Sequence, residues 1–304
     1  MTRGVENSFS FTLNGERVEV CDVPPNTTLL DWLRRNGRVG TKCGCAEGDC
    51  GACTVALLDT DAAGRPAWRS LNSCIALLPM FAGREVVTVE GVARGDELHP
   101  VQACMIKHYG SQCGYCTPGF VMSLFEGYYR DDLHERWQIA DQLCGNLCRC
   151  TGYRSIRDAA LEAFAQRTKD DAFDAKLTNE APALAPLRYE TDAQSFSRPN
   201  SLAELLALKR QHPDARLVAG ATEIGVEINK KFQRFPRLIS TEAVAELSAI
   251  RSTSEAWHIG AAATLTAIEE ALAGEFPSID KMLRVFASRQ IRDRATMGGN
   301  LVTA

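Results

Sequence analysis

Eight of the twelve cysteines in this sequence fall into two sets whose spacing could support metal chemistry. In the first set the spacing is C-x4-C-x2-C, and a fourth cysteine follows further along the chain. Four thiolates spaced in this way form the plant-type site for a [2Fe-2S] cluster. A zinc ion is the alternative, although structural zinc usually takes its cysteines from two short knuckles separated by a longer loop. The candidate iron ligands of this first set are Cys45, Cys50, Cys53 and Cys74.

The second set consists of two close pairs of cysteines, one with two intervening residues and one with a single intervening residue. Four cysteines from two hairpins could also hold zinc, so this spacing alone is less specific. Beside a plant-type site, however, it favours a second [2Fe-2S] cluster. Two such one-electron centres in one chain predict an electron relay. The candidate ligands are Cys113, Cys116, Cys148 and Cys150.

Glycines alternate with the cysteines of the first set, at Gly44, Gly48 and Gly51. Glycine allows the backbone to approach closely and to adopt positive φ, so that its N–H groups can point at sulfur atoms and stabilise their negative charge. We therefore expect this loop to wrap tightly around an anionic centre.

Four cysteines remain outside both sets: Cys21, Cys43, Cys104 and Cys144. Free cysteine is among the most buried residue types, so we expect these four to be small buried side chains. Cys43 lies two residues from Cys45 and could compete for iron, but only Cys45 has the four-residue spacing to Cys50. The sequence therefore predicts Cys45 as the ligand.

The composition is that of an ordinary water-soluble protein, with 45% hydrophobic and 24% charged residues. A length of 304 residues is enough for about two domains. The net charge of -4 argues weakly against a nucleic-acid partner. There is no signal-peptide core at the N-terminus and no apolar run of ~18 residues, so we expect a cytoplasmic location without membrane contact. Under reducing conditions, closely spaced thiols point to metal rather than to disulfides.

The elements around the first set predict a small sheet with one helix. Apolar residues alternate on both sides of Asn14-Gly15, which indicates a β-hairpin over 8–20. Thr27 and Thr28 can cap a helix over 29–34, and further strands are expected over 54–58 and 86–89. Two strands, a helix and a cysteine loop are typical of a β-grasp ferredoxin domain.

The next segment is expected to be helical. Pro100 suits the first position of a helix that ends near Gly110, and further helices are predicted over 117–128, 137–143 and 155–164. Each cysteine pair of the second set then lies between two helices. A four-helix bundle would bring both loops to one end, where the N-termini of the following helices face an anionic cluster.

Residues 169–192 have low hydrophobicity with Pro and Ala, which favours a linker. Beyond it, a strand over 216–220 enters a turn at 221–225, and a second glycine-rich stretch covers 295–301. Such turns can present N–H groups to a pyrophosphate, or they can be plain turns without a ligand. Neither the G-x-G-x-x-G pattern nor a Walker lysine is present. Small residues at 260–264 indicate a strand end, and 286–294 a helix with a basic end.

The cysteine motifs, taken in order, resemble the iron–sulfur part of the molybdenum hydroxylases, and among these the xanthine dehydrogenase type. The resemblance covers about residues 8–168, on the motifs 40–45, 51–54, 110–119 and 145–154. The stretches 217–225 and 296–300 resemble two FAD-binding stretches of the same family, with Ala221 at a position where relatives often carry Asn. The expected FAD contacts are Leu217, Val218, Ala219, Gly220, Ala221, Thr222, Glu223, Ile224, Phe286, Thr296, Met297, Gly298, Gly299 and Asn300.

The resemblance implies an α+β multidomain fold. Its parts are a β-grasp [2Fe-2S] domain over 1–92, a four-helix [2Fe-2S] domain over 93–168, the linker 169–192 and an FAD-binding domain over 193–304. The last is expected to be α+β, of the PCMH or vanillyl-alcohol-oxidase type, and incomplete at its C-terminal end. We therefore expect weak or absent FAD binding by this chain alone.

The resemblance also implies a function: the iron–sulfur/FAD subunit of an NAD-dependent xanthine dehydrogenase. A separate large subunit would hold the molybdenum cofactor and oxidise hypoxanthine and xanthine to urate, in a heterotetramer of two small and two large subunits. The Cys113 set would lie nearer the molybdopterin and the Cys45 set nearer FAD. Gln112 is expected as a contact on the pterin side, and no catalytic acid–base residue is expected in this chain.

Three alternatives remain at this point. A related hydroxylase acting on an aldehyde, carbon monoxide or another heteroaromatic would share the iron–sulfur motifs. An electron carrier without flavin function would share the clusters only. A zinc-stabilised interaction module would be colourless and without labile sulfide.

Overall fold

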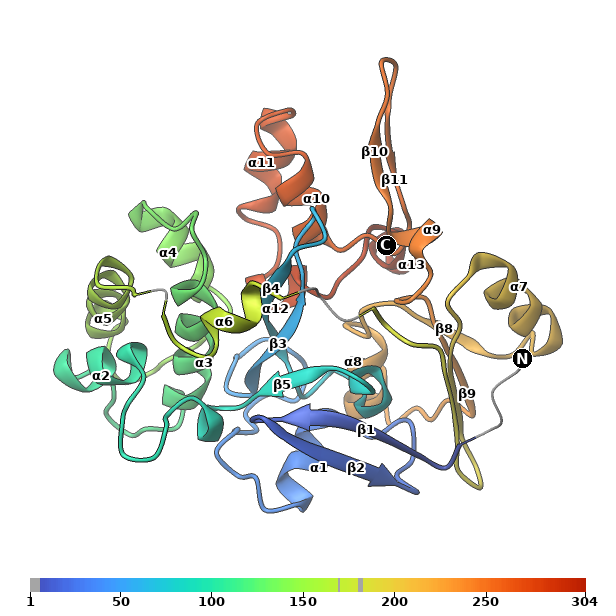
Figure 1. Cartoon of the computed structure of the whole chain (residues 1–304), viewed down its shortest axis with the longest axis horizontal. Coiled ribbons are helices and arrows are strands. Elements are labelled where there is room, and N and C mark those ends of the chain that lie inside the picture. The colour runs from blue at the N-terminus through green and yellow to red at the C-terminus, as the bar shows by residue number, and fades with distance from the viewer. Residues whose placement is uncertain (1–5, 169, 180–182) are drawn as a thin grey trace.

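The computed structural model describes residues 6–168, 170–179 and 183–304, which form three contiguous parts (Figure 1). The helices of residues 100–165 gather at the left of the view, a sheet formed by strands within residues 187–240 lies at the right, and a five-stranded sheet of residues 8–87 lies between them. Within the described residues, no helix is long and apolar enough to cross a membrane.

The first part confirms the predicted hairpin, helix and β-grasp sheet. β1 (Ser8–Leu13) and β2 (Glu16–Cys21) pair antiparallel around Asn14-Gly15. The sheet order is β2-β1-β5-β3-β4, with β5 (Glu85–Val87) parallel to β1 and antiparallel to β3 (Thr54–Thr60). β4 is Pro66–Asn72, and two 3-10 turns cover Leu78–Phe81 and Val89–Gly91.

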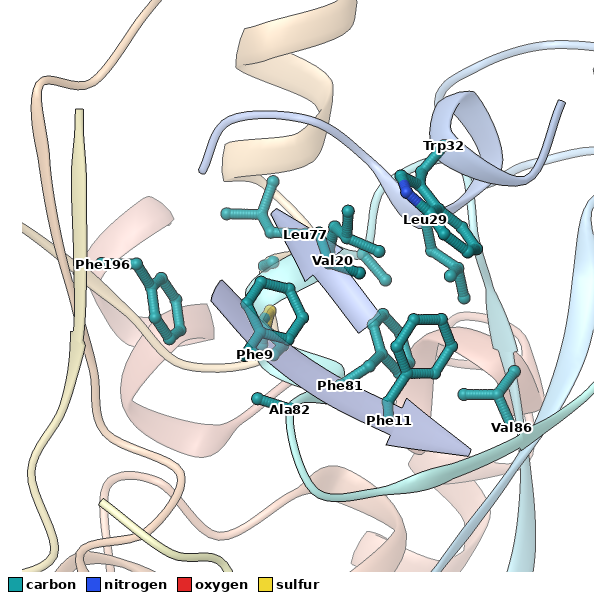
Figure 2. Packing of buried hydrophobic residues seen from close by; sticks show 14 of the residues in the cluster. Phe9, Phe11, Val20, Leu29, Trp32, Leu77, Phe81, Ala82, Val86 and Phe196 are labelled. Carbon is teal, nitrogen blue, oxygen red and sulfur yellow. The ribbon is translucent and has the colours of Figure 1, made fainter. Parts of the chain in front are cut away.

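Helix α1 (Leu29–Arg35) covers one face of this sheet. The Thr28 hydroxyl accepts a hydrogen bond from Asp31 N at 3.2 Å and so caps the helix, as predicted. Every second residue of β1 is buried, which places Phe9 and Phe11 in the core. Figure 2 shows this core, where Phe196 of the C-terminal part lies beside Phe9. The first and third parts therefore share one hydrophobic core.

The second part is the predicted set of four helices. They are α2 (Pro100–Lys107), α3 (Thr117–Tyr128), α4 (Arg136–Leu143) and α5 (Arg154–Ala165). Helix α3 is buried from Gly119 to Tyr128, because one side packs on the helical core and the other on Trp68 of β4. This helix joins the second part to the first.

His99 caps α2 and is buried among aromatic rings of α3. Its Nδ1 accepts from Val101 N at 3.3 Å and its Nε2 lies 2.9 Å from the Tyr129 hydroxyl. Burial lowers the pKa of His99 to about 4, with Arg94 acting in the same direction and Asp171 opposing it. The folded state therefore holds a neutral imidazole.

This burial predicts a pH dependence of stability. An unfolded histidine titrates near ~6.5, so between that pH and about 4 the unfolded chain binds more protons than the folded chain. The neutral, buried His99 therefore contributes its full share of the free energy of unfolding above pH ~6.5, and this share is lost as the pH falls. We expect the free energy of unfolding to decrease by about 2 kcal/mol between pH 7 and pH 5 for this reason. Urea unfolding of wild type and His99→Asn at both pH values measures it. Equal pH slopes in the two proteins would contradict the assignment.

Residues 169–192 were expected to be a linker, but the described part of this segment contains a helix and a strand. Residues 169 and 180–182 lie outside the described part. It holds α6 (Asp174–Leu177) and β6 (Leu187–Glu190). Phe173 packs on Trp68, whose indole N–H donates to the Phe173 carbonyl at 3.2 Å. Tyr189 is fully buried and its hydroxyl bonds both the N–H and the carbonyl of Val23. These aromatic anchors fix much of the segment against the first part.

The third part is built on a four-stranded sheet of order β6-β7-β9-β8. β7 (Ser195–Arg198) is antiparallel to β6 and parallel to β9 (Arg237–Ser240), and β8 (Arg216–Val218) is parallel to β9. A small hairpin of β10 (Ile250–Ser252) and β11 (Trp257–Ile259) projects at the top of Figure 1. The remaining elements are α7 (Leu202–Gln211), α8 (Ile224–Lys230), α9 (Ala245–Ser248), β10 (Ile250–Ser252), β11 (Trp257–Ile259), α10 (Leu265–Ala271), α11 (Pro277–Leu283), α12 (Arg289–Arg292) and α13 (Met297–Thr303).

Two local predictions in this part differ from the structure. The helix expected over 286–294 is only the single turn α12, because Ala287 has a φ of +55° and interrupts the helical path. The glycine-rich stretch near Gly298 is not a turn but the start of α13. Thr296 caps that helix by accepting from Gly299 N at 3.1 Å.

Candidate iron–sulfur and flavin sites

The four thiols of the first set, Cys45, Cys50, Cys53 and Cys74, come together on the loop before β3 and the turn after β4. The Cys45 sulfur accepts from Cys50 N at 3.4 Å and from Glu47 N at 3.5 Å. The Cys74 thiol hydrogen-bonds Cys45, and with the N–H donors it lowers the pKa of Cys45 to about 3. The same thiol lowers the pKa of Cys53. These contacts favour the thiolate, the form that binds iron, at Cys45 and Cys53. The same hydrogen bonds raise the pKa of Cys74, and burial raises that of Cys50.

Glycine is required within this loop for steric reasons. A Cβ on Gly44 would lie 2.7 Å from the Cys50 sulfur, and Gly48 has a φ of +89°. The tight wrapping expected from the sequence is confirmed, since backbone N–H groups of 45, 47 and 50 point at the sulfurs.

The second thiol set, Cys113, Cys116, Cys148 and Cys150, lies on the loops that precede α3 and α5. The thiols meet in two pairs, each with one member from either loop: Cys113 with Cys150, and Cys116 with Cys148. Cys148 also receives Thr151 N at 3.5 Å. Cys113 and Cys150 are exposed at the surface. The helical bundle thus brings both loops to one place, as the sequence predicts.

The donor sets fit a two-iron group. A [2Fe-2S] cluster is held by four thiolates, divided between its two irons. In the first set Cys74 contacts Cys45 and Cys53, and Cys45 also contacts Cys50. In the second set the thiols meet in two pairs. Each set therefore supplies four thiols in mutual contact.

The loops of the two thiol sets are in direct contact. Leu147 N donates to the Cys50 carbonyl at 3.0 Å, and the Asn146 amide donates to the Gly51 carbonyl at 3.1 Å. The Tyr115 hydroxyl, between two cysteines of the second set, donates to the Cys43 carbonyl. Any two groups held by these loops are therefore joined through short hydrogen-bonded backbone paths.

Gly119 permits this contact, and its replacement gives a testable result. A Cβ at Gly119 would lie 2.1 Å from the Gly51 carbonyl oxygen, a backbone atom that cannot rotate away. We expect Gly119→Ala to cost about 1–3 kcal/mol, as overpacking usually does, and to move the two loops apart. Thermal unfolding measures the first effect, and the EPR spin–spin splitting between the two reduced centres measures the second. An unchanged melting temperature would show that the loops can separate freely.

The expected flavin contacts lie where three segments of the third part meet. Leu217 and Val218 end β8, 219–223 form the following turn, and Ile224 begins α8. A Cβ on Gly220 would lie 1.7 Å from the Arg294 carbonyl oxygen. Ala221 has a φ of +65°, a conformation in which asparagine is enriched. The residue that departs from the family pattern therefore occupies a strained backbone position.

The second glycine-rich stretch closes this junction. Met297 N donates to the Ala263 carbonyl at 3.1 Å and Gly298 N to the Ala261 carbonyl at 2.8 Å. Gly299 and Asn300 are exposed on α13, and Phe286 is partly exposed before α12. The small residues at 260–264 thus hold the second stretch, while the first stretch meets the chain just before it, where Gly220 packs on the Arg294 carbonyl.

Three of the cysteines outside both sets are not buried, contrary to the prediction. Cys21 is exposed at the end of the edge strand β2, Cys144 at the end of α4, and Cys43 on the outside of the first loop. Only Cys104 is buried as predicted. A short strand or helix end lacks a neighbouring element to cover its last side chain.

Sequence reasoning missed the residues that connect the three parts. Arg289, Gln290 and Arg292 of α12 are buried and bond to the helical part, and Asn229 of α8 bonds to the first cysteine loop. The one available signal was the clustering of three arginines over 289–294 together with Gln290 and Asp293.

Comparison with protein families agrees with this three-part organisation. Residues 11–78 match the 2Fe-2S iron-sulfur cluster binding domain, and residues 88–161 match a [2Fe-2S] binding domain. Residues 190–304 match the FAD binding domain in molybdopterin dehydrogenase.

Curated relatives are similar along the whole chain. The xanthine dehydrogenase/oxidase of Mus musculus is 35% identical over 358 residues, which cover 100% of this chain and 27% of the relative. The xanthine dehydrogenase of Emericella nidulans is 33% identical, with coverage of 100% and 27%. Aldehyde oxidase 2 of Cavia porcellus is 33% identical, with coverage of 96% and 27%. The chain thus spans about a quarter of the length of these relatives.

Proposed function

The chain belongs to the molybdenum hydroxylase family, of which it holds two [2Fe-2S]-binding domains and an FAD-binding domain, and from this premise we propose that it relays electrons from a molybdenum cofactor to FAD. Each cluster supplies a one-electron centre and FAD a two-electron acceptor. The chain's own task is to hold these groups close together in a fixed order.

The proposed ligands are the two thiol sets: Cys45, Cys50, Cys53 and Cys74 for the first cluster, and Cys113, Cys116, Cys148 and Cys150 for the second. The observation that carries the proposal is the direct contact of the two loops through Leu147 N and the Cys50 carbonyl. Because the rate of electron transfer falls with distance, such a contact suits consecutive centres of a relay.

The different exposure of the two thiol sets supports an order of electron transfer through the two proposed clusters. Gln112, Cys113 and Cys150 are exposed, so a partner that holds molybdenum can approach the second set. The first set instead lies beneath α8, which follows the proposed FAD turn over 217–224. We assign the second cluster to the molybdenum side and the first to the flavin side, with Gln112 as a contact of the partner.

The substrate that we propose is hypoxanthine or xanthine, oxidised to urate, with NAD as the final acceptor. Support comes from the names of the relatives at 33–35% identity, several of which are xanthine dehydrogenases. We propose that a separate large subunit holds the molybdenum cofactor. Two small and two large subunits would form a cytoplasmic heterotetramer. Aldehyde oxidation is the second candidate, because an aldehyde oxidase is also 33% identical.

The test uses the enzyme assembled with its molybdenum partner. Iron, sulfide and flavin are quantified, and EPR of the dithionite-reduced enzyme should show two distinct [2Fe-2S] signals. Xanthine should then reduce both clusters anaerobically and reduce NAD in turnover. Absence of two signals would contradict the relay, whereas two signals with reduction by an aldehyde and not by xanthine would contradict only the proposed substrate.

A further inference from the structure

One amide side chain of the third part holds together the two chain segments that carry the first thiol set. Asn229 Nδ2 donates to the Ala46 carbonyl at 3.0 Å and to the Cys74 carbonyl at 2.7 Å. Ala46 directly follows Cys45 and has a φ of +57°. Both acceptors therefore belong to, or adjoin, proposed iron ligands.

The rest of α8 is built to bring Asn229 to this place. A Cβ on Gly225 would lie 2.3 Å from the Ile75 carbonyl oxygen, so only glycine allows α8 to approach so closely. Val226 packs against the buried group that contains Cys53, Cys74 and Ile75. Residues 225 and 229 are one helical turn apart, so they share the face that meets the loop.

The other end of α8 connects directly to the proposed flavin turn over 219–223. The helix thus spans from the proposed flavin site to the first thiol set. We propose that Asn229 is a positioning residue for electron transfer, which fixes the first cluster against the flavin domain and helps to set its reduction potential. This inference rests on the proposed electron relay.

The chemistry of asparagine suits both tasks. A primary amide has two N–H donors on one nitrogen and so can serve two carbonyl groups without carrying a net charge. The two N–H groups offset the negative ends of the Ala46 and Cys74 carbonyl dipoles, which adjoin proposed ligands. A cluster held by those ligands would gain negative charge on reduction, so these hydrogen bonds would favour the reduced state. Aspartate has nearly the same size but no donor, and its negative charge would oppose reduction.

The experiment is an EPR-monitored redox titration of the assembled enzyme, with each signal followed separately. The variants are Asn229→Ala and Asn229→Asp. The matched control is Asn179→Ala, because Asn179 is exposed and its amide bonds only within its own turn. The signal that belongs to the first cluster is identified as the one lost in Cys45→Ser.

We expect Asn229→Ala to shift the reduction equilibrium of the first cluster about threefold toward the oxidised form, and Asn229→Asp about tenfold. For a one-electron couple a tenfold shift is about 59 mV. The second cluster and the control should keep the wild-type potentials. Loss of the first signal alone in the Asp variant would also support the proposal, since it shows that the ligands have moved apart.

A side chain with a merely structural role would lower the melting temperature and leave the potentials unchanged. Wild-type potentials of both clusters in both Asn229 variants would therefore overturn the inference. Failure of the proposed function would be seen differently, as the lack of two cluster signals in the wild-type enzyme itself.

Discussion

Replacing Cys45 with serine should abolish one of the two [2Fe-2S] EPR signals, while the same replacement at Cys43 should leave both signals in place. The Cys45 sulfur receives two backbone N–H groups and the Cys74 thiol, so it lies inside the first set. The Cys43 side chain is exposed, and it is the Cys43 backbone carbonyl that receives the Tyr115 hydroxyl. The Cys45 sulfur therefore lies among the other thiols of the set, whereas the Cys43 side chain is open to solvent.

The replacement Cys45→Ser should also have a large effect on turnover of the assembled enzyme. In the proposed relay, loss of the first cluster would interrupt electron transfer ahead of FAD. We therefore expect flavin reduction by xanthine, the proposed substrate, to fall at least about a hundredfold, to about 1% of wild type, in Cys45→Ser. Reduction of the second cluster by the same substrate should persist, because the second thiol set shares no ligand with the first. Rapid-mixing spectroscopy with EPR of frozen samples separates these steps. Equal losses in Cys43→Ser and Cys45→Ser would show that the ligand assignment is wrong.

The parts of this fold that could be predicted from the sequence are those fixed by nearby residues. The hairpin over 8–21 follows from alternation around Asn14-Gly15, and the thiol sets follow from spacing within short loops. The placement of each cysteine pair between two helices also predicted that the two loops of the second set meet, but not that Cys113 meets Cys150. Local patterns of this kind need no knowledge of the tertiary contacts.

The junction of the three parts could not be predicted, because its partners lie far apart in the chain. Arg289 bonds Glu126 across 163 positions, and Asn229 bonds Cys74 across 155. The sequence predicted a helix over 286–294 with a basic end but not its burial, and Arg289 and Arg292 are almost fully buried. Nothing in the local pattern around an arginine shows that a carboxylate will meet it in the interior.

The centre of this junction is a buried carboxylate served by all three parts. Glu126 of α3 accepts Arg289 Nε at 3.0 Å and Gln142 Nε2 at 2.9 Å, and it also accepts from Ser70 of β4. Burial alone would raise its pKa, but the Arg289 and Arg130 guanidinium groups hold the pKa of Glu126 down to about 2. Asp293 lies 3.3 Å from the same Arg289. The Arg289 guanidinium therefore lies between two buried carboxylates. Burial raises the pKa of Asp293 to about 7, so Glu126 is the more firmly ionised of the two.

Beside this pair, Gln290 extends the junction to the thiol loops. Its amide donates to Ser123 Oγ at 2.9 Å and to Asn146 Oδ1 at 2.8 Å, and the Asn146 amide in turn reaches the Gly51 carbonyl. The turn α12 thus touches both loops and the carboxylate in between. Separation of α12 from the helical part would remove these contacts together.

Arg289→Met should therefore destabilise the protein by about 3–5 kcal/mol, the usual cost of leaving a buried charge without its partner. The double variant Arg289→Met, Glu126→Gln should recover part of this loss, because it removes the Glu126 charge that the first change leaves without Arg289. Arg237→Met is the matched control: its pair with Asp214 is exposed, and its loss should cost no more than about 1 kcal/mol. Urea unfolding of the four proteins gives the energies. If Arg289→Met were no worse than Arg237→Met, the buried pair would contribute nothing to holding the flavin domain on the clusters, and the apolar core shared through Phe9 and Phe196 would have to hold it alone.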